Sequence, residues 1–254
     1  MKFLVTTKKN IKHIAFLLIV ALLLSINFFG APSATVYFGN SPRLVPIYNV
    51  ATEEKKVAIT FDSAWGADKT QGILDLLKEY NAKGTFFLVG FWAEKYPDMV
   101  KAINEAGIEI ATHSNTHPDF TKLSETQMQQ ELELSINTIK SITNKDIKLF
   151  RSPYGAYNNT SINVATNLGL QTIQWDVDTL DWKGLSAGEM VKRVSSKVQN
   201  GSIILCHNNS DNIIDGLRLI LDYLTSSGYK VVSVGDLVYK DNYTIDHAGV
   251  QHKN

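Results

Sequence analysis

The sequence contains a single cysteine, Cys206, among its 254 residues. A chain with one cysteine forms no internal disulfide, so a domain made from it must be stable through its hydrophobic core alone. Cys206 ends the apolar run 202–206, where a cysteine is more often a small buried side chain than a nucleophile. The sequence therefore excludes a disulfide-stabilised scaffold and favours a structural cysteine.

An excess of basic residues is also absent, since Lys and Arg number 25 and so do Asp and Glu. The first thirty residues contain four lysines and no acid, so the remaining 21 basic residues face 25 acidic ones, a formal charge of −4. Nucleic-acid-binding domains usually carry a basic patch. We therefore expect no nucleic-acid partner.

Charge is missing altogether from Ile14–Phe29, sixteen residues that come soon after the lysines. Positive residues before an apolar run predict that the amino end stays inside and that the rest of the chain is exported. A small-x-small cleavage site is hard to place in 30–34, and the run is slightly short for a membrane span. Residues 1–30 are thus expected to be either a signal peptide or a membrane anchor, and both alternatives stay open.

The rest of the chain divides into three parts. Residues 31–55 contain three prolines and no sustained periodicity, which predicts a connecting segment with one short strand near Leu44–Tyr48. Residues 56–240 form the expected domain, since a chain of this length buries one sizeable core. Residues 241–254 are polar, and we expect a poorly ordered tail.

Short apolar runs alternate with amphipathic stretches throughout the domain. Seven runs predict buried strands: Val57–Phe61, Gly84–Val89, Ile108–Thr112, Lys148–Arg151, Leu170–Trp175, Ser202–Cys206 and Lys230–Val234. Helical stripes lie between them, for example around Leu77, Leu132 and Leu217. This alternation predicts an α/β fold with parallel strands, either an open doubly wound sheet or a barrel with one strand fewer than eight. No Gly-x-Gly-x-x-Gly follows the first strand, so the dinucleotide-binding version has no support.

Polar residues gather where five of the predicted strands end, which favours the barrel because its active-site groups lie on the loops after the strands. The segments in question are 60–66, 113–117, 151–155, 176–182 and 207–208. We expect the functional site at this rim.

His113 and His117 are four residues apart after the third strand. On a helical turn this spacing places both imidazoles on one face, as a divalent metal requires of two nitrogen ligands. Alone the pattern is weak, because a surface or core pair of histidines is commoner. The position at a strand end and the nearby acid Asp62 favour the metal site.

Asp62 directly follows the first strand, and the alternative to a functional role is a turn or helix-capping acid. As a general base it would deprotonate a water activated by the metal. A buried Arg151 would need a carboxylate partner, and it would orient Asp62 and hold it ionised. His207 is the candidate general acid, tuned by Asp181 or Asp178.

In this order the motifs resemble the polysaccharide deacetylase family, also known as the NodB-homology domain or carbohydrate esterase family four. The matching segments, spread from about residue 55 to 238, are Thr60-Phe61-Asp62, His113-Ser114-x-x-His117, Arg151-Ser152-Pro153-Tyr154-Gly155, Asp178-Thr179-Leu180-Asp181-Trp182 and Leu205-Cys206-His207. The resemblance implies a distorted (β/α) barrel with about seven parallel strands. It also implies metal-dependent hydrolysis of N-acetyl groups on a glycan, with the active site at the carboxyl ends of the strands.

The resemblance also assigns roles to individual residues. Catalytic residues would be Asp62, Arg151, Asp181 and His207; metal ligands His113 and His117; substrate-binding residues Trp65, Tyr154, Trp182 and Leu205. The Tyr154 N–H would stabilise the oxyanion, and Trp182 and Leu205 would line the acetyl slot. The cofactor would be a divalent metal, zinc or alternatively cobalt or manganese. The partner would be a cell-wall glycan, with membrane contact only through the N-terminal segment, and the protein would be a monomer.

Ser63 departs from the family pattern, which has a metal-binding aspartate directly after the base. A hydroxyl is a poor ligand, and catalytic zinc usually keeps three protein ligands. A weaker site, recruitment of another acid such as Asp68, or loss of activity would each accommodate the change. The segment Phe61-Asp62-x-x-Trp65-Gly66 resembles the sporulation-associated PdaB-type deacetylases of peptidoglycan.

Three functions remain open at this point. The first is an active peptidoglycan N-deacetylase, and the second is a catalytically weak glycan-binding or wall-morphogenesis protein that lost full metal binding at Ser63. The third is the same barrel acting on a small cyclic amide.

Overall fold

The computed structural model describes residues 13, 15–19 and 42–254. Its contacts divide the chain into two units, Met1–Pro42 and Arg43–Asn254. In the first unit, residues 13 and 15–19 are helical, and most of the predicted leader lies outside the described residues. None of the helices within the described residues has the length and hydrophobicity of a membrane span.

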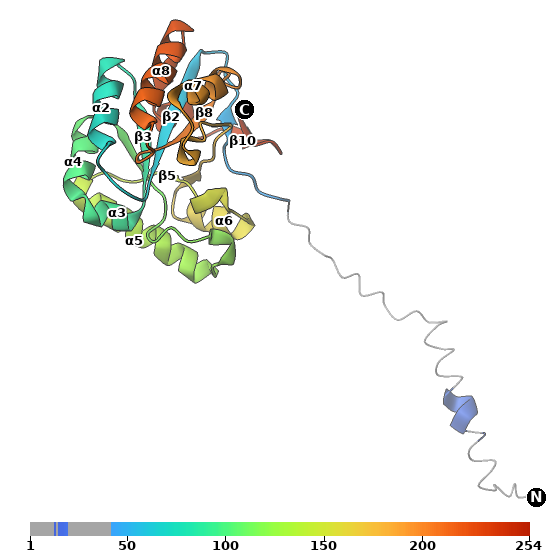
Figure 1. Ribbon diagram of the computed structural model, residues 1–254. Coiled ribbons are helices and arrows are strands. Elements are labelled where there is room, and N and C mark those ends of the chain that lie inside the picture. The colour runs from blue at the N-terminus through green and yellow to red at the C-terminus, as the bar shows by residue number, and fades with distance from the viewer. Residues whose placement is uncertain (1–12, 14, 20–41) are drawn as a thin grey trace, which may run out of the picture. The chain divides into compact units, whose positions relative to one another are not determined.

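A parallel sheet of seven strands curls into a half-barrel in the second unit (Figure 1). Every neighbouring pair along this path is parallel. In spatial order the strands are β6 (Gln171–Thr172), β5 (Leu149–Phe150), β4 (Glu109–Thr112), β3 (Gly84–Leu88), β2 (Lys56–Ser63), β8 (Ile203–His207) and β7 (Val177–Asp178). An eighth strand, β9 (Lys230–Val232), pairs with the start of β2. The predicted barrel and all seven predicted strands are confirmed, and β7 is additional.

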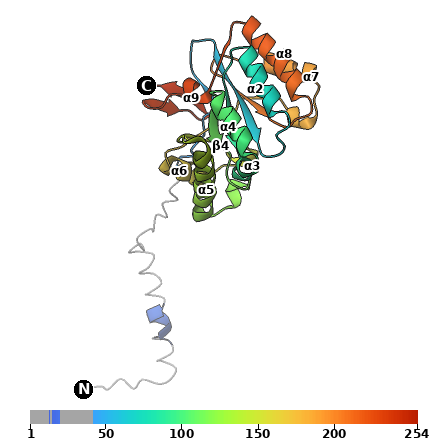
Figure 2. The same ribbon diagram turned by 90° about the vertical axis from the view of Figure 1, so that its left-hand side faces the viewer.

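Helices pack on the outer side of the sheet (Figures 1 and 2). They are α2 (Thr70–Glu79), α3 (Gly90–Lys95), α4 (Pro97–Glu105), α5 (Glu125–Thr143), α6 (Asn159–Asn167), α7 (Ala187–Ser195) and α8 (Ile213–Ser226). The short helix α9 (Val234–Leu237) instead packs its buried side chains into the cluster on the inner side. Three short 3₁₀ turns are η1 (Phe120–Lys122), η2 (Pro153–Gly155) and η3 (Asp181–Lys183). The predicted apolar stripes are buried, since Leu77, Leu132 and Leu217 lie fully inside the core.

The side chains of β2 alternate between two environments. Ile59 and Phe61 belong to the core that faces the helices, whereas Ala58 belongs to a second cluster inside the curl. Thr60 and Asp62 follow Ala58 on the same inner face, because successive side chains of a strand point to opposite sides. The inner face is therefore apolar at its start and polar at its carboxyl end, which places Asp62 at the rim.

The segment before β2 is part of the folded unit. Ile47 forms a parallel bridge to Ile173, just after β6, and β1 (Asn49–Val50) bridges to the residue before β8. The predicted connecting segment thus joins the fold from Arg43 onward. Burial of apolar side chains such as Ile47 stabilises this contact, which a search for periodicity over such a short run does not detect.

The prediction of a poorly ordered tail at the carboxyl end was wrong. The chain ends in two antiparallel strands, β10 (Tyr243–Ile245) and β11 (Val250–Lys253), and β11 also pairs in parallel with β1. Asp246 closes the turn by accepting hydrogen bonds from two backbone N–H groups. The buried Gln251 side chain exchanges two hydrogen bonds with the backbone of Tyr239. These polar contacts order a segment whose composition alone indicates a solvated tail.

Candidate active site

A cavity of about 620 Å³ opens at the carboxyl ends of the strands. Nine of the ten predicted site residues line the cavity: Asp62, Trp65, His113, His117, Tyr154, Asp181, Trp182, Leu205 and His207. The tenth, Arg151, is fully buried and bonds to Asp62 on the cavity wall. The structure therefore brings all ten predicted residues to one rim.

The register of the sheet explains this convergence. Asp62 lies beside His207 in the pairing of β2 with β8. His113 and Arg151 each directly follow the paired last residues of β4 and β5. Because parallel strands end at the same edge of a sheet, side chains from distant parts of the sequence meet there.

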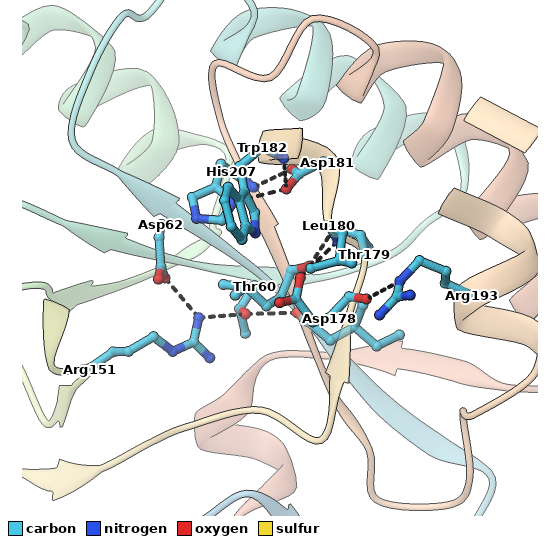
Figure 3. A network of polar contacts seen from close by, with 12 residues as sticks. Thr60, Asp62, Arg151, Asp178, Thr179, Leu180, Asp181, Trp182, Arg193 and His207 are labelled. Carbon is cyan, nitrogen blue, oxygen red and sulfur yellow. Dashed lines mark hydrogen bonds and ion pairs between the residues drawn. The ribbon is translucent and has the colours of Figure 1, made fainter. Parts of the chain in front are cut away.

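Asp62 and Arg151 form a buried ion pair (Figure 3). Arg151 Nη1 donates to Asp62 Oδ1 at 2.8 Å and to Thr60 Oγ1 at 2.8 Å, and Nη2 donates to the carbonyl of Gln174 at 3.1 Å. The guanidinium also lies 4.1 Å from the ring centroid of Phe87. Burial alone would raise the pKa of Asp62, but the charge of Arg151 holds this pKa below its usual value. Asp62 is thus kept ionised and oriented.

His113 turns an unprotonated ring nitrogen toward Asp62. Its Nδ1 lies 2.8 Å from the carbonyl oxygen of Arg151, and since a carbonyl only accepts, Nδ1 carries the hydrogen and Nε2 has a free lone pair. Nε2 lies 3.5 Å from Asp62 Oδ2. Burial lowers the pKa of His113, so the ring is neutral near pH 7. Two acceptors that face each other in this way suit a shared cation.

His117 lies on a loop, which corrects the predicted helical turn. Ser114 and His117 have φ values of 72° and 61°, so the segment between β4 and η1 is not helical. The two imidazoles nevertheless lie close together, with ring centroids 5.0 Å apart. Burial, together with the neighbouring His113, lowers the pKa of His117 to about 4. Both rings are therefore neutral, as metal ligation requires.

Glu131 of α5 holds the histidine loop in place. Its carboxylate accepts hydrogen bonds from the N–H of Asn115 at 2.9 Å, from the N–H of Thr116 at 2.7 Å and from the Thr116 hydroxyl at 2.6 Å. Sequence reasoning missed this residue, because an acid on a long amphipathic helix has the pattern of a solvated side chain. Only the packing of α5 beside the loop reveals its role.

His207 is bonded to Asp181 on the other side of the cavity (Figure 3). Its Nδ1 lies 2.8 Å from Asp181 Oδ1, and its backbone N–H donates to Asp181 Oδ2 at 2.6 Å. Burial alone would lower the pKa of His207, but Asp181 raises it above the usual value. Of the two predicted tuning acids, Asp181 makes the contact, and Asp178 instead accepts from the N–H of Leu180.

The predicted substrate-binding aromatics surround the cavity mouth. Trp65 is 58% exposed, Tyr154 70% and Trp182 57%, which is unusual for large apolar side chains. Leu205, in contrast, is buried in the cavity wall. Exposed rings beside a cleft form an apolar surface on which a ligand can stack.

Ser63 is fully buried, and its hydroxyl has no hydrogen-bond partner in the described part of the chain. Asp68, the acid considered as its replacement, is exposed and does not line the cavity. Within residues 42–254, no group of three or more His, Cys, Asp or Glu side chains is arranged to hold a metal ion. The two neutral imidazoles fit as nitrogen ligands, and the donor set is one short of three.

The fold is a parallel α/β barrel with a cavity at its rim. Asp62, paired with Arg151, and His207, paired with Asp181, face this cavity. The family model described as "Polysaccharide deacetylase" matches residues 49–173. The chain is 35% identical over 193 residues to the peptidoglycan-N-acetylglucosamine deacetylase PgdA of Listeria monocytogenes, covering 76% of this chain and 41% of the relative. It is 33% identical over 199 residues to a peptidoglycan-N-acetylglucosamine deacetylase of Bacillus cereus, covering 75% of this chain and 92% of the relative.

A solved structure adds a contrasting neighbour. A mutant of BA3943, a CE4 family pseudoenzyme of Bacillus anthracis described as having restored enzymatic activity, superimposes with a TM-score of 0.75 at 33% identity. The match covers 77% of this chain and 72% of that one. This chain belongs to the polysaccharide deacetylase family, as its motifs predicted. It spans less than half the length of the Listeria relative.

Proposed function

We propose that this chain is a hydrolase that removes N-acetyl groups from the amino sugars of peptidoglycan. One observation carries the proposal: the ionised Asp62 on β2 lies beside His207 on β8, which is bonded to Asp181, and all three face the same cavity. Curated relatives named as peptidoglycan deacetylases support the substrate class.

Asp62 acts as the general base. Its carboxylate keeps one oxygen, Oδ1, on Arg151 and turns the other, Oδ2, toward His113. A water bound between Asp62 and the acetyl carbonyl loses its proton to this carboxylate as it attacks. The lowered pKa of Asp62 supports the role, because the base must be ionised before the reaction starts.

His207 acts as the general acid. Its Nδ1 is held by Asp181, so Nε2 is the free end of the ring. Nε2 donates a proton to the sugar nitrogen as the C–N bond breaks, which releases acetate and leaves an amine. The raised pKa of His207 supports this step, since it favours the protonated ring that a general acid requires.

His113 and His117 would hold a divalent cation, zinc or alternatively cobalt or manganese, which when bound supplies a Lewis acid for the acetyl carbonyl. The Tyr154 N–H stabilises the developing oxyanion. Trp182 and Leu205 contact the acetyl methyl group, and Trp65 contacts the sugar ring.

Acetate release from defined N-acetylated peptidoglycan fragments tests the proposal. We expect acetate from the wild-type chain with added zinc, and little after treatment with a chelator. Fragments that carry acetyl groups on only one of the two amino sugars identify the target. Absence of acetate from every fragment, with zinc, cobalt or manganese added in turn, would contradict the proposal.

A second candidate is a glycan-binding or wall-morphogenesis protein without turnover. Ser63 and the missing third ligand favour it, as does the likeness to a protein described as a pseudoenzyme. Binding to insoluble peptidoglycan without acetate release would support this candidate. The variant Ser63→Asp restores the carboxylate, and acetate release by that variant alone would locate the lost activity at this position.

We also propose that the chain works outside the cytoplasm, as a monomer either secreted or anchored through residues 14–29. The lysines before this uncharged run support export. The resemblance to PdaB-type proteins supports a role in sporulation. Cell fractionation and the mass of the mature protein test export and cleavage, and the acetylation of spore peptidoglycan in a deletion strain tests the role. Full-length protein confined to the cytoplasm would contradict export.

A further inference from the structure

The two imidazoles of the site are held in different ways. His113 is oriented by the hydrogen bond from its Nδ1 to the Arg151 carbonyl. The Nδ1 of His117 is also buried, but it has no hydrogen-bond partner in the part of the chain that the structure describes. Metal-binding histidines usually have such a bond on the second nitrogen, and it fixes the plane of the ring. Something else must orient His117.

Aromatic rings surround His117 instead. The Tyr154 ring lies 4.6 Å away between centroids at an interplanar angle of 75°, and the Trp65 ring lies 5.1 Å away at 65°. His113 completes the set at 5.0 Å and 70°. All three contacts are edge-to-face, the arrangement that aromatic rings prefer.

The backbone beside both aromatic residues is itself fixed. The carbonyl of Gly66, next to Trp65, accepts hydrogen bonds from Trp92 Nε1 at 2.6 Å and from Asn208 Nδ2 at 2.9 Å. Tyr154 lies in a 3₁₀ turn closed by the bond from the N–H of Gly155 to Ser152. Rings on fixed loops can restrict a neighbouring ring, whereas rings on loose loops cannot.

We propose that Trp65 and Tyr154 are positioning residues that clamp the His117 imidazole by packing, in place of the hydrogen bond that its Nδ1 does not make within the described residues. Their exposed faces stay free for a sugar while their inner contacts fix a ligand. The consequence for metal binding rests on the proposed function, but the clamp does not. A loosened ring would weaken zinc binding about 10- to 100-fold, as lost outer-shell contacts do.

Ring mobility of His117 tests the clamp without metal. In the full chain with isotope-labelled histidine, the His117 signals are assigned by their loss in His117→Gln, and their relaxation reports ring order. We expect a more mobile ring in Trp65→Ala and in Tyr154→Ala. The matched variants Trp65→Phe and Tyr154→Phe keep an aromatic edge and should keep the order. Both side chains are largely exposed, so neither truncation should unfold the protein.

Zinc titration of the same variants tests the consequence. The alanine variants should bind zinc about 10- to 100-fold more weakly, the phenylalanine variants should not, and Trp182→Ala should bind zinc like the wild type. Unchanged ring order in both alanine variants would overturn the clamp. A wild-type chain that binds no zinc while the alanine variants loosen the ring would support the clamp and overturn the metal role proposed for His117.

Discussion

The two sides of the cavity hold their ionisable groups in different ways. Asp62 is 7% exposed and paired with a fully buried arginine, whereas 26% of the His207 side chain is exposed and its partner is the buried Asp181. A permanent buried cation stabilises one charge state of its neighbour, so Asp62 stays ionised. A partly exposed imidazole beside a carboxylate can both bind and release a proton. Asp62 therefore carries a fixed charge, whereas His207 can donate a proton.

Asp62→Asn removes the fixed charge and should have the largest effect. An amide cannot accept the proton of the attacking water, so acetate release should fall by about 10²- to 10⁴-fold. Circular dichroism should still show the folded spectrum, because Asn keeps the shape of the side chain, but the variant should unfold at lower urea concentration, because the buried Arg151 loses its anionic partner. Turnover that survives this substitution would remove Asp62 from the role of base.

Arg151→Ala removes the cation of the ion pair and should lower the free energy of unfolding. It leaves a buried carboxylate without its cation, which costs about 3–5 kcal/mol of the free energy of unfolding. Arg218→Ala is the matched control, because Arg218 pairs with Glu79 at 2.6 Å while both side chains are about half exposed. That control should lose little stability, because an exposed ion pair contributes little to the free energy of unfolding. Equal losses in urea unfolding would show that the burial of the Asp62 pair has no special energetic role.

Glu131→Ala tests whether Glu131 stabilises the loop that carries His113 and His117. It leaves the backbone N–H groups of the loop without their acceptor, and we expect a loss of about 1–3 kcal/mol in the same unfolding measurement. Glu133→Ala removes an exposed acid two residues along the same helix and should change stability by less than about 0.5 kcal/mol. A loss no larger than that of the control would mean that the loop is ordered without Glu131.

Asp181→Asn tests the role of His207 as general acid through the pH dependence of activity. Because Asp181 raises the pKa of His207, the neutral amide should lower that pKa. A general acid works while it is protonated, and activity is lost as the pH rises through its pKa. The alkaline limb of the kcat/KM profile should therefore move to lower pH. A limb that stays in place would assign it to another group.

Much of the fold could be predicted because its strands are short, apolar and regularly spaced. Asp62, Arg151 and His207 were found for the same reason, since each ends or directly follows such a run and parallel strands end at one edge. In contrast, β7 has only two residues and follows the polar Asp176, so it carries no periodic signal. The hairpin at the carboxyl end depends on side-chain hydrogen bonds of Asp246 and Gln251 that composition does not reveal.

Glu131 was the part of the site that sequence reasoning could not find. It contacts a loop that is 15 residues away along the chain. This contact exists only after packing brings the two elements together, and nothing in the residues around Glu131 marks it. The helical spacing of His113 and His117 was also misleading, because two residues with positive φ turn that segment into a loop.

The most direct test is acetate release from N-acetylated peptidoglycan fragments by the wild-type chain, measured beside Asp62→Asn and with zinc or chelator. We predict zinc-dependent release by the wild type and loss of it in the variant. No release by the wild type under any condition, together with binding to the glycan, would contradict catalysis and leave a protein that holds the wall polymer without cutting its amides.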